Sequence, residues 1–290
     1  MSQVETTFPQ DDWTARLLTR SLAEDVGPGD ASTAVTAAEG AQGQAEIVAR
    51  EAGRLAGGPL VDRLYSALDP AVRVERMVAD GSDLSVGQTV ARVTGPVAAL
   101  LTGERTALNF LQHLSGIASL THRYVQAVAG TTCRVLDTRK TLPGYRHLAK
   151  YAVRCGGGHN HRMGLYDRIM LKDNHWAAAG GTVEDLVARS RRLYPDLAVE
   201  VEVDTLAQLD RVLPLKVEWI LLDNFTVADT AEAVARRKAA GGSTLLESSG
   251  NVTLETIGHY ARAGVDAASV GRLTHSAPAF DLGMDMAVRP

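Results

Sequence analysis

The amino-acid sequence predicts an α/β protein in which an incomplete parallel barrel follows a smaller domain with antiparallel strands. From about residue 130 onward, short β-prone segments alternate with helix-like stretches, a pattern typical of parallel sheets and barrels. Almost every one of these segments is followed by a charged residue or by a residue of a phosphate-binding type. The first hundred residues instead contain short alternating segments between glycine-rich turns, as antiparallel strands do.

The composition is that of an ordinary globular protein. The chain has 290 residues, of which 45% are hydrophobic and 22% are charged, and its net charge is −4. This length allows one large domain with a smaller one, and the charge argues against a general binder of nucleic acid or membranes. The only cysteines are Cys133 and Cys155, the first residues are polar, and no apolar run is long enough to cross a bilayer. We therefore expect a cytoplasmic protein without a disulfide framework.

The first domain is expected over residues 1–115. Apolar and polar residues alternate over 72–79 and over 88–95, which predicts antiparallel strands. The sequence then changes, because leucine and isoleucine recur at helical spacing between residues 108 and 117. This spacing predicts a helix at the end of the first domain.

The barrel domain is expected over residues 116–275, and the tail 276–290 is expected to pack back on the first domain. The β-prone segments of the barrel are 132–136, 168–171, 198–203, 219–222, 243–247 and 267–271. They predict a barrel of six or seven strands. Residues after the strands of a barrel converge on one mouth, whereas a doubly wound sheet collects its ligands near one switch point from fewer strands. Polar chemistry after six different strands therefore favours the barrel.

Cationic side chains lie beside several of the predicted strand ends. They are Arg139, Lys140, Arg162 and Lys172, with His161 beside them, and Asp173 and Asn174 come directly after Lys172. Like charges that are brought together repel each other, so such a cluster is tolerable when an acidic ligand neutralises it. Arginine suits the bidentate recognition of carboxylates and phosphates. The sequence therefore predicts an anion-binding pocket at the barrel mouth.

Two acidic residues lie opposite these cations in the predicted mouth. In AVEVEV, residues 198–203, Glu200 and Glu202 lie on one face of the strand and the valines lie on the other. We interpret Glu202, near the strand end, as functional, and Glu200, deeper in the strand, as structural. Glu202 and Asp223 can hold Mg²⁺ together with substrate phosphates. Later strand ends carry a set that is typical of barrel phosphate sites, namely Ser249, Gly250, Asn251 and Gly271.

The segment GGGHNHRMGLYDRIMLKDNH, residues 156–175, allows several interpretations. Its histidines, His159, His161 and His175, could bind zinc, but a helical histidine pair and a cysteine pair are absent. The letters HNH name a nuclease motif, yet the chain is acidic overall, unlike a nucleic-acid enzyme. A Walker loop is absent too. The glycines permit positive φ or a close backbone approach. The remaining alternative is an ordinary mobile glycine loop with exposed basic residues, and the number of cations nearby favours the anion pocket over it.

Several segments together resemble the quinolinate phosphoribosyltransferases, the carboxylating nicotinate-nucleotide pyrophosphorylases. The most specific is the run from 137 to 175, DTRKTLPGYRHLAKYAVRCGGGHNHRMGLYDRIMLKDNH. The others are LNFLQHLSGIAS (108–119), VEVEVDT (199–205), LLDNF (221–225), ESSGNV (247–252) and ASVGRLTHSAPAFDLGM (268–284). The resemblance extends over nearly the whole chain and includes EDVGPGDAST near the N-terminus.

The resemblance implies a fold and a reaction. The fold is an N-terminal α/β sandwich domain followed by an incomplete α/β barrel, and two chains form a homodimer. The reaction belongs to NAD biosynthesis. It combines quinolinate with 5-phosphoribosyl 1-pyrophosphate (PRPP) in the presence of Mg²⁺ and gives nicotinate mononucleotide, pyrophosphate and CO₂.

The resemblance also implies roles for individual residues. The quinolinate carboxylates are held by a cationic set made of Arg139, His161, Arg162 and Lys172, with Arg105 reaching in from the other subunit. Lys140 and Lys172 face the PRPP phosphates. Glu202 and Asp223 take the ribose hydroxyls and Mg²⁺, directly or indirectly, and these two acids with the two lysines are the expected catalytic residues. The other expected substrate contacts are Thr138, Ser248, Ser249, Gly250, Asn251, Val270, Gly271 and Arg272.

Three functional hypotheses follow from these residues. The first is the quinolinate enzyme, and the second is a relative that acts on a different acceptor, such as nicotinate, or a molybdenum-cluster-associated homologue of unknown substrate. Arg139 and Arg162 together with Arg105 favour a dicarboxylate, because a monocarboxylate needs fewer cations. The third hypothesis is a non-catalytic sensor of PRPP or nucleotides. The acids Glu202 and Asp223 argue against a sensor, since a sensor does not need them.

Overall fold

The computed structural model describes residues 7–172, 175 and 181–288. The chain divides into two compact units, each of which is described by itself. Unit 1 comprises Met1–His122, Thr141–Gly157 and Leu273–Pro290, and unit 2 comprises Arg123–Lys140 and Gly158–Arg272. Unit 1 thus takes in a segment, 141–157, that lies within the range predicted for the barrel domain. The domain boundaries after residues 115 and 275 remain predictions.

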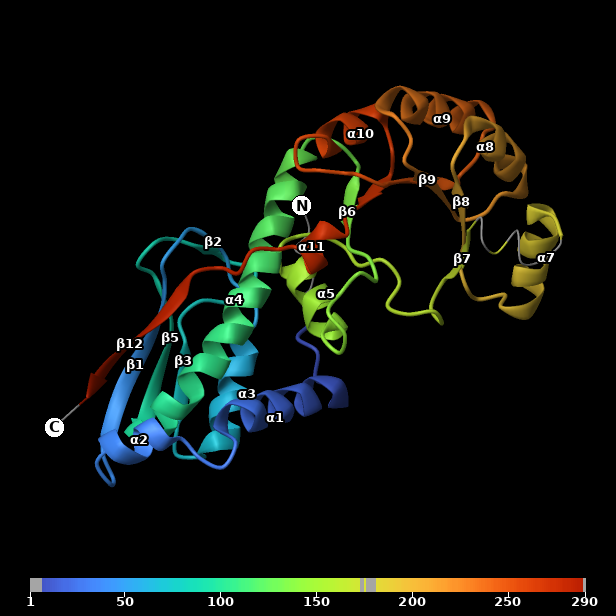
Figure 1. Ribbon diagram of the computed structural model, residues 1–290. Coiled ribbons are helices and arrows are strands. Elements are labelled where there is room, and N and C mark those ends of the chain that lie inside the picture. Colours follow the sequence, from blue (N-terminus) through green and yellow to red (C-terminus); the bar gives the residue numbers. More distant parts are fainter. Residues whose placement is uncertain (1–6, 173–174, 176–180, 289–290) are drawn as a thin grey trace. The chain divides into compact units, whose positions relative to one another are not determined.

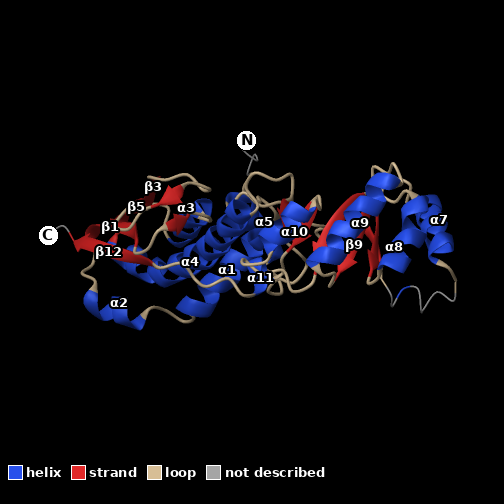
Figure 2. Cartoon of the chain, turned by 90° about the horizontal axis from the view of Figure 1, so that it is seen from above, coloured by secondary structure: helices blue, strands red, loops and turns tan. Residues whose placement is uncertain are grey.

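Unit 1 contains a four-stranded antiparallel sheet whose strands come from distant parts of the sequence. They are β1 (Gln42–Ala49), β3 (Arg73–Arg76), β5 (Thr89–Pro96) and β12 (Leu282–Val288), in the order β12-β1-β5-β3 (Figure 2). The C-terminal strand β12 pairs with β1, with Ala45 opposite Met286. A second, two-stranded sheet consists of β2 (Gly53–Arg54) and β4 (Asp83–Leu84). The strands predicted over 72–79 and 88–95 are confirmed as β3 and β5.

Unit 1 also contains helices. They are α1 (Asp12–Val26), α2 (Ala31–Thr36), α3 (Gly58–Leu68), α5 (Arg146–Cys155) and the first part of α4 (Val97–Ala127). The Tyr65 hydroxyl of α3 donates a hydrogen bond to the Leu100 carbonyl of α4 at 3.2 Å. The predicted helix is confirmed, although it begins already at Val97, directly after β5. Its apolar residues at 108, 111, 114 and 117 are all buried, because the helical spacing places them on one face.

Unit 2 is an incomplete barrel of six parallel strands (Figure 1). The strands are β6 (Arg134–Leu136), β7 (Ile169–Leu171), β8 (Val199–Val203), β9 (Trp219–Asp223), β10 (Leu245–Ser249) and β11 (Ala267–Ser269). Their order in the sheet is β6-β11-β10-β9-β8-β7. The first strand therefore lies beside the last, and in the described residues the sheet has its two edges at β6 and β7. The predicted fold class, an N-terminal α/β sandwich domain plus an incomplete barrel, is confirmed, with six strands in the barrel.

The strands of unit 2 are covered on their outer side by helices (Figure 1). These are α7 (Val183–Leu193), α8 (Leu206–Val212), α9 (Val227–Ala239) and α10 (Ile257–Ala263), with a short 3₁₀ turn, η1 (Leu213–Leu215), after α8. The short helix α11 (Arg272–His275) follows β11 and belongs to unit 1 except for its first residue. Threonine side chains cap α7, α8 and α9 at their N-termini, which satisfies backbone N–H groups that the helices themselves leave unpaired.

The alternation in β8 follows the prediction. The valines at 199, 201 and 203 are fully buried, while Glu200 and Glu202 lie on the opposite face of the strand. As for membranes, no helix among the described residues combines the length and the apolarity that a bilayer crossing needs.

Candidate active site at the strand ends of unit 2

A cavity of about 570 Å³ opens where the strands of unit 2 end. All of its lining residues belong to unit 2. They come from all six strands or from the residues directly after them, except His161 and Arg162, which lie in the segment before β7. They are Thr138, Arg139, Lys140, His161, Arg162, Met170, Lys172, Glu202, Leu221, Asp223, Asn224, Glu247, Ser249, Gly250, Asn251 and Ser269. We call this cavity the strand-end pocket. Convergence of this kind is what a parallel barrel produces at the C-terminal ends of its strands.

The structure brings most of the predicted site residues into this pocket. The four predicted cations, His161, Glu202, Asp223 and Thr138 all line it, as do Ser249, Gly250 and Asn251. Five predicted substrate contacts do not: Arg105, Ser248, Val270, Gly271 and Arg272. Ser248 and Val270 are buried, and Arg272 is exposed. Asp173 and Asn174 lie outside the described residues.

Arg105 lies on α4 in unit 1. Its side chain is 61% exposed, and its guanidinium is 3.9 Å from the carboxylate of the adjacent Glu104. The role that the sequence assigned to Arg105 requires a second subunit and remains a prediction.

The GGGHNHR segment enters the pocket along the edge of β6. His159 makes an isolated parallel bridge to Leu136, and its backbone N–H donates to the Val135 carbonyl at 2.8 Å. Asp137, which is fully buried, accepts the backbone N–H of His161 at 2.9 Å and the side-chain amide of Asn160 at 2.5 Å. The segment is therefore an ordered continuation of the sheet edge. Gly157, in the glycine run before it, has a φ of 85°, which confirms the predicted positive φ.

Hydrogen bonds determine the tautomer of the buried His161 ring. The backbone N–H of Arg162 donates to Nδ1 of His161 at 2.7 Å. A backbone amide can only donate, so Nδ1 carries a lone pair and the ring proton is on Nε2. This Nε2 lies 3.1 Å from Oε2 of Glu200 and 3.5 Å from Oε2 of Glu247. His161 therefore donates to Glu200, and Glu247 lies beside this hydrogen bond without a hydrogen-bond partner of its own among the described residues.

This tautomer also bears on metal binding. Among the described residues, His161, Glu200 and Glu247 are the group whose side chains are close enough to share a metal ion. A metal would need the Nε2 lone pair, and the proton on Nε2 occupies that position. Of the three histidines in the zinc interpretation, His161 alone belongs to this trio, and its Nε2 donates to Glu200. His175 is also engaged, since its Nδ1 accepts the backbone N–H of Lys172 at 3.0 Å.

Arg162 lines the pocket, and its guanidinium contacts residues beneath the pocket. Its guanidinium donates to the Arg168 carbonyl at 3.4 Å and lies 3.5 Å from the Met170 sulfur. Burial, with repulsion from Arg139, lowers the pKa of Arg162 below its ordinary value. Arg168 in turn donates to Oε2 of Glu200 at 3.3 Å, and its guanidinium lies 5.1 Å from the ring centre of Trp219, within the range of a cation–π contact.

The acidic side of the pocket consists of Glu202 and Asp223. Oε2 of Glu202 forms an ion pair with the Lys172 ammonium, and Oδ2 of Asp223 accepts the Asn224 side-chain amide at 2.8 Å. Burial raises the pKa of Glu202 above its ordinary value, and the carboxylates of Asp223 and Asp204 add to the rise, although Lys172 acts in the opposite direction. Two hard oxygen donors thus lie beside the cations, a combination that suits Mg²⁺.

The segment after β10 forms a strained turn at the pocket. Gly250 has a φ of 83°, and Asn251 and Asn224 have φ values of 50° and 54°. The Asn224 backbone N–H donates to the Ser249 carbonyl at 2.9 Å, which ties the ends of β9 and β10 together. A methyl group at residue 250 would overlap the Asn224 side chain. Turns of this kind can gather successive backbone N–H groups around an anion.

Sequence reasoning missed several lining residues, and Glu247 is the most informative of them. Glu247 is fully buried in β10, between Leu221 and Ala267 in register. Burial and the neighbouring Glu200 raise its pKa well above the ordinary value, against smaller lowering effects of Ser269 and Arg168. A sequence signal existed, because an acid ends the apolar run STLLE (243–247), and Glu202 likewise lies near the end of its own strand. Asn224, Ser269, Met170 and Leu221 were also missed.

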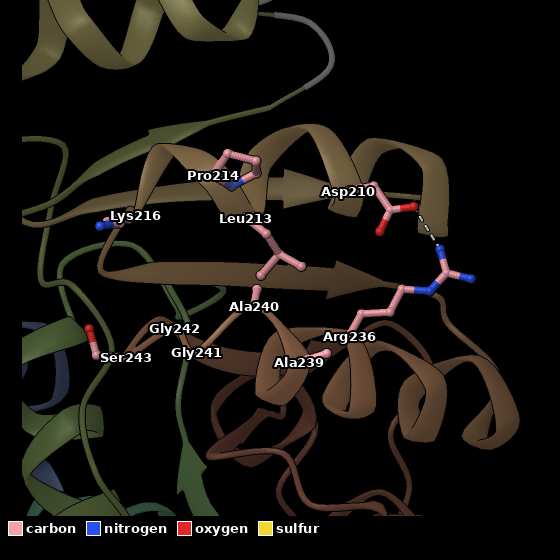
Figure 3. A pocket seen from close by; sticks show the side chains of 10 residues that line it. All are labelled: Asp210, Leu213, Pro214, Lys216, Arg236, Ala239, Ala240, Gly241, Gly242 and Ser243. Atoms are coloured by element: carbon pink, nitrogen blue, oxygen red, sulfur yellow. Dashed lines mark hydrogen bonds and ion pairs between the residues drawn. The ribbon is translucent and has the colours of Figure 1, made fainter.

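A second cavity of about 640 Å³ lies at the other ends of the strands (Figure 3). Its lining comes from residues 213–216, before β9, and from residues 239–243, before β10, together with Asp210 and Arg236. Arg236 in this cavity is already paired, since it donates to Asp210 at 2.7 Å and to Glu232 at 2.8 Å. Because barrel active sites form at the C-terminal strand ends, we assign the chemistry to the strand-end pocket.

Comparisons with known proteins agree with this arrangement. Residues 30–115 match the model of the quinolinate phosphoribosyl transferase N-terminal domain, and residues 117–285 match that of the C-terminal domain. The chain is 47% identical to the nicotinate-nucleotide pyrophosphorylase [carboxylating] of Mycobacterium leprae, over 92% of this chain and 95% of the relative.

Two solved structures are similar over almost their whole length. The nicotinate-nucleotide pyrophosphorylase of Francisella tularensis has a TM-score of 0.91 at 35% identity, over 97% of this chain and 98% of that one. NadC from Streptococcus pyogenes has a TM-score of 0.92 at 40% identity, over 98% of this chain and 100% of that one.

Proposed function

The chain belongs to the quinolinate phosphoribosyltransferase family, and from this membership and the strand-end pocket we propose its reaction. It transfers the phosphoribosyl group of PRPP to quinolinate, with loss of CO₂, and forms nicotinate mononucleotide and pyrophosphate. This reaction is that of a carboxylating nicotinate-nucleotide pyrophosphorylase in the de novo biosynthesis of NAD.

The observation that carries the proposal is the charge arrangement of the pocket. Arg139, Lys140, Arg162 and Lys172 line one cavity together with Glu202 and Asp223. A dicarboxylate and a polyphosphate need several cations, and each charged hydrogen bond contributes roughly 1.5–3 kcal/mol. Arg139 and Arg162 suit the two carboxylates of quinolinate, because a guanidinium matches a carboxylate in a bidentate geometry. A nicotinate-specific site would have one carboxylate to neutralise.

Glu202 and Asp223 act on the sugar in this proposal. Ribosyl transfer develops positive charge on the ribose, and preorganised carboxylates stabilise such charge in a pocket that excludes water. Lys140 takes the departing pyrophosphate, and Lys172 faces both the phosphates and the quinolinate. The turn at Ser249, Gly250 and Asn251 receives the 5′-phosphate. Orientation and charge neutralisation therefore supply most of the catalysis, without a covalent nucleophile.

The carboxylates of the pocket also fit Mg²⁺. Within the described part of the chain, Lys172 takes Oε2 of Glu202 and Asn224 takes Oδ2 of Asp223, so Oε1 and Oδ1 are available for a cation. A hard divalent ion held by one or two carboxylates and by substrate phosphates is the usual magnesium arrangement. When bound, it would neutralise charge on the pyrophosphate.

Loss of CO₂ follows from the chemistry of the product ring. Once the ring nitrogen is bonded to ribose, the ring is a pyridinium, and its positive charge stabilises the electron pair that remains when the 2-carboxylate departs. The protein holds the ring in place through the cations on both carboxylates. A pocket without charged side chains would not hold both carboxylates. The arginines of this pocket therefore contribute by orienting the ring for the loss of CO₂.

A homodimer completes the site in this proposal, with Arg105 contributed by the second subunit. The support is chemical: Arg105 is exposed, it does not line the pocket of unit 2, and a further guanidinium suits a dicarboxylate. We also propose that the protein works in the cytoplasm, because its cysteines are buried free thiols, as is usual in a reducing compartment.

The test is an assay of the purified protein with Mg²⁺, PRPP and quinolinate. We expect CO₂, pyrophosphate and nicotinate mononucleotide in equal amounts, and no product when nicotinate replaces quinolinate. Protein carrying Glu202→Gln, purified in the same way, controls for contaminating enzymes and should be nearly inactive. Consumption of nicotinate with quinolinate ignored would contradict the proposal.

A further inference from the structure

Two fully buried carboxyl groups meet one imidazole beneath the strand-end pocket. Glu200 of β8 and Glu247 of β10 are each 0% exposed, and both direct an oxygen at Nε2 of His161, at 3.1 and 3.5 Å. The proposed reaction assigns no role to Glu200 or Glu247. Burying these ionisable groups together nevertheless costs free energy unless their charges balance.

The charges around these three side chains can be counted from their contacts. His161 is neutral, because Nδ1 accepts the Arg162 backbone N–H and the ring proton is on Nε2. Arg168 supplies one positive charge and donates to Glu200. The other groups that face Glu247 are the Ser269 hydroxyl and the Cys133 thiol, and burial raises the pKa of that thiol to about 12. Arg168 is thus the cation in direct contact with Glu200, and Arg162 acts on Glu200 electrostatically without an ion pair.

Glu200 has both the contact with Arg168 and the attraction of Arg162, so the contacts select Glu247 as the carboxyl group that is neutral. Glu200 accepts from both His161 and Arg168, which stabilises its ionised form. Glu247 is within hydrogen-bond distance of neither a cation nor a backbone N–H among the described residues. Two carboxyl groups that share a site do not ionise together. The raised pKa of Glu247 agrees with this geometry.

We propose that Glu247 is a protonated, neutral carboxylic acid in the working enzyme and that Glu247, Glu200 and His161 together are positioning residues for Arg162. His161 holds the Arg162 backbone N–H through Nδ1, and Arg168, fastened to Glu200, holds the Arg162 guanidinium through its carbonyl. His161 thereby acts through Arg162, with its own two ring nitrogens occupied inside the protein. The neutral state of Glu247 also keeps a third carboxylate out of a pocket that binds anions.

The role for Arg162 rests on the proposed function, whereas the proton on Glu247 does not. The proton can be seen directly by infrared spectroscopy of wild-type protein and Glu247→Gln, since glutamine has the size and the neutrality of the protonated acid. We expect the difference spectrum at neutral pH to contain the carbonyl band of a protonated carboxylic acid. A difference spectrum with carboxylate bands only would overturn the proposal.

The tautomer of His161 has an independent readout. With nitrogen-15 in the histidine rings, the His161 signals can be assigned among the 8 histidines by their loss in His161→Asn. We expect one protonated nitrogen, Nε2, and one bare nitrogen, Nδ1. Two protonated nitrogens, or a proton on Nδ1, would contradict the positioning scheme.

Two substitutions distinguish the roles of the two ring nitrogens of His161. Asparagine can supply the acceptor of Nδ1 to the Arg162 N–H, and glutamine can supply the donor of Nε2 to Glu200. Because Arg162 is held through Nδ1, His161→Gln should raise the quinolinate KM at least about tenfold, and His161→Asn should raise it several-fold less. The PRPP KM should change little in both. Equal effects of the two variants, or an unchanged quinolinate KM in His161→Gln, would sink the role for Arg162.

The matched control is His147→Asn. His147 is a half-exposed histidine of unit 1 that is paired with Asp11 at 2.6 Å, and its replacement should leave both KM values unchanged. If the protein had no transferase activity at all, the proposed function would fail, while the infrared and nitrogen-15 measurements would still decide the state of Glu247 and His161.

Discussion

The ammonium group of Lys172 and the carboxylate of Glu202 form an ion pair between the end of β7 and the neighbouring strand β8. We expect Glu202→Gln to lower kcat by about 10²-fold or more, because it removes a carboxylate from beside the reacting sugar. Lys172→Met should chiefly raise the quinolinate and PRPP KM values. Since the two residues are in contact, the double variant should lose less than the product of the single losses.

Steady-state kinetics with both substrates would check these losses. Lys216→Met is the matched control, because Lys216 lines the cavity at the opposite strand ends (Figure 3) and its loss should leave the kinetics unchanged. Fully multiplicative effects in the double variant would show that the ion pair does not act as a unit.

Arg105 tests the proposed dimer. Arg105→Ala should raise the quinolinate KM strongly and leave the PRPP affinity nearly intact, because the proposal assigns Arg105 to a quinolinate carboxylate. Mixing this variant with Glu202→Gln should restore activity, to about a quarter of the sites if dimers form at random, because one site of each mixed dimer is intact. The same experiment with Arg211→Ala, an exposed arginine of α8, should show no defect to restore. A mixture as inactive as its components would argue against a shared site.

Gly250 tests the phosphate role of the turn after β10. Gly250→Ala places a side chain at a φ of 83° and against Asn224, so it should raise the PRPP KM and also destabilise the fold. The matched control is Gly241→Ala, which has a φ of 62° and open space around it. Both variants should lose about 1–2 kcal/mol from backbone strain, measured by urea unfolding, and only Gly250→Ala should change the PRPP KM. A normal PRPP KM in Gly250→Ala would remove the turn from the site.

Glu247 predicts a specific pH dependence of stability. Its pKa is raised in the folded protein, so the folded state keeps a proton that the unfolded state releases above the ordinary value near 4.5. The stabilisation from this proton is complete below that pH and is lost as the pH rises toward the folded pKa. Wild-type protein should therefore lose stability relative to Glu247→Gln by up to about 1.4 kcal/mol per pH unit above about pH 5. Urea unfolding of both proteins from about pH 5 to pH 7 measures this, and a constant difference would contradict a raised pKa.

Much of the barrel could be predicted because its pattern is local. The alternation in AVEVEV put the valines on the covered face of β8 and Glu202 at the pocket, since side chains of a strand alternate whatever its neighbours are. The cations at 139, 140, 162 and 172 could be grouped before the structure was known, because each was expected beside a strand end and parallel strands end at the same mouth. Roles such as magnesium binding by Glu202 and Asp223 stay predictions.

Other features depended on contacts between distant segments. The antiparallel sheet of unit 1 includes β12, which comes from the last residues of the chain and pairs with β1. The segment 141–157 belongs to unit 1 although the sequence on both sides of it belongs to unit 2. Neither arrangement leaves a mark in the local periodicity of hydrophobic residues.

The sequence by itself determined the barrel class, the strand ends and the cationic character of the pocket, because these follow from spacing along single segments. Only the tertiary structure decided what lies beneath the pocket. Glu247 and Glu200 come from β10 and β8, which lie on either side of β9 in the sheet, and the segment that carries His161 runs beside β6. This arrangement brings the three side chains together. Which of the two buried acids keeps a proton depends on the distances between these side chains and on the position of Arg168. No sequence pattern within one segment encodes those distances.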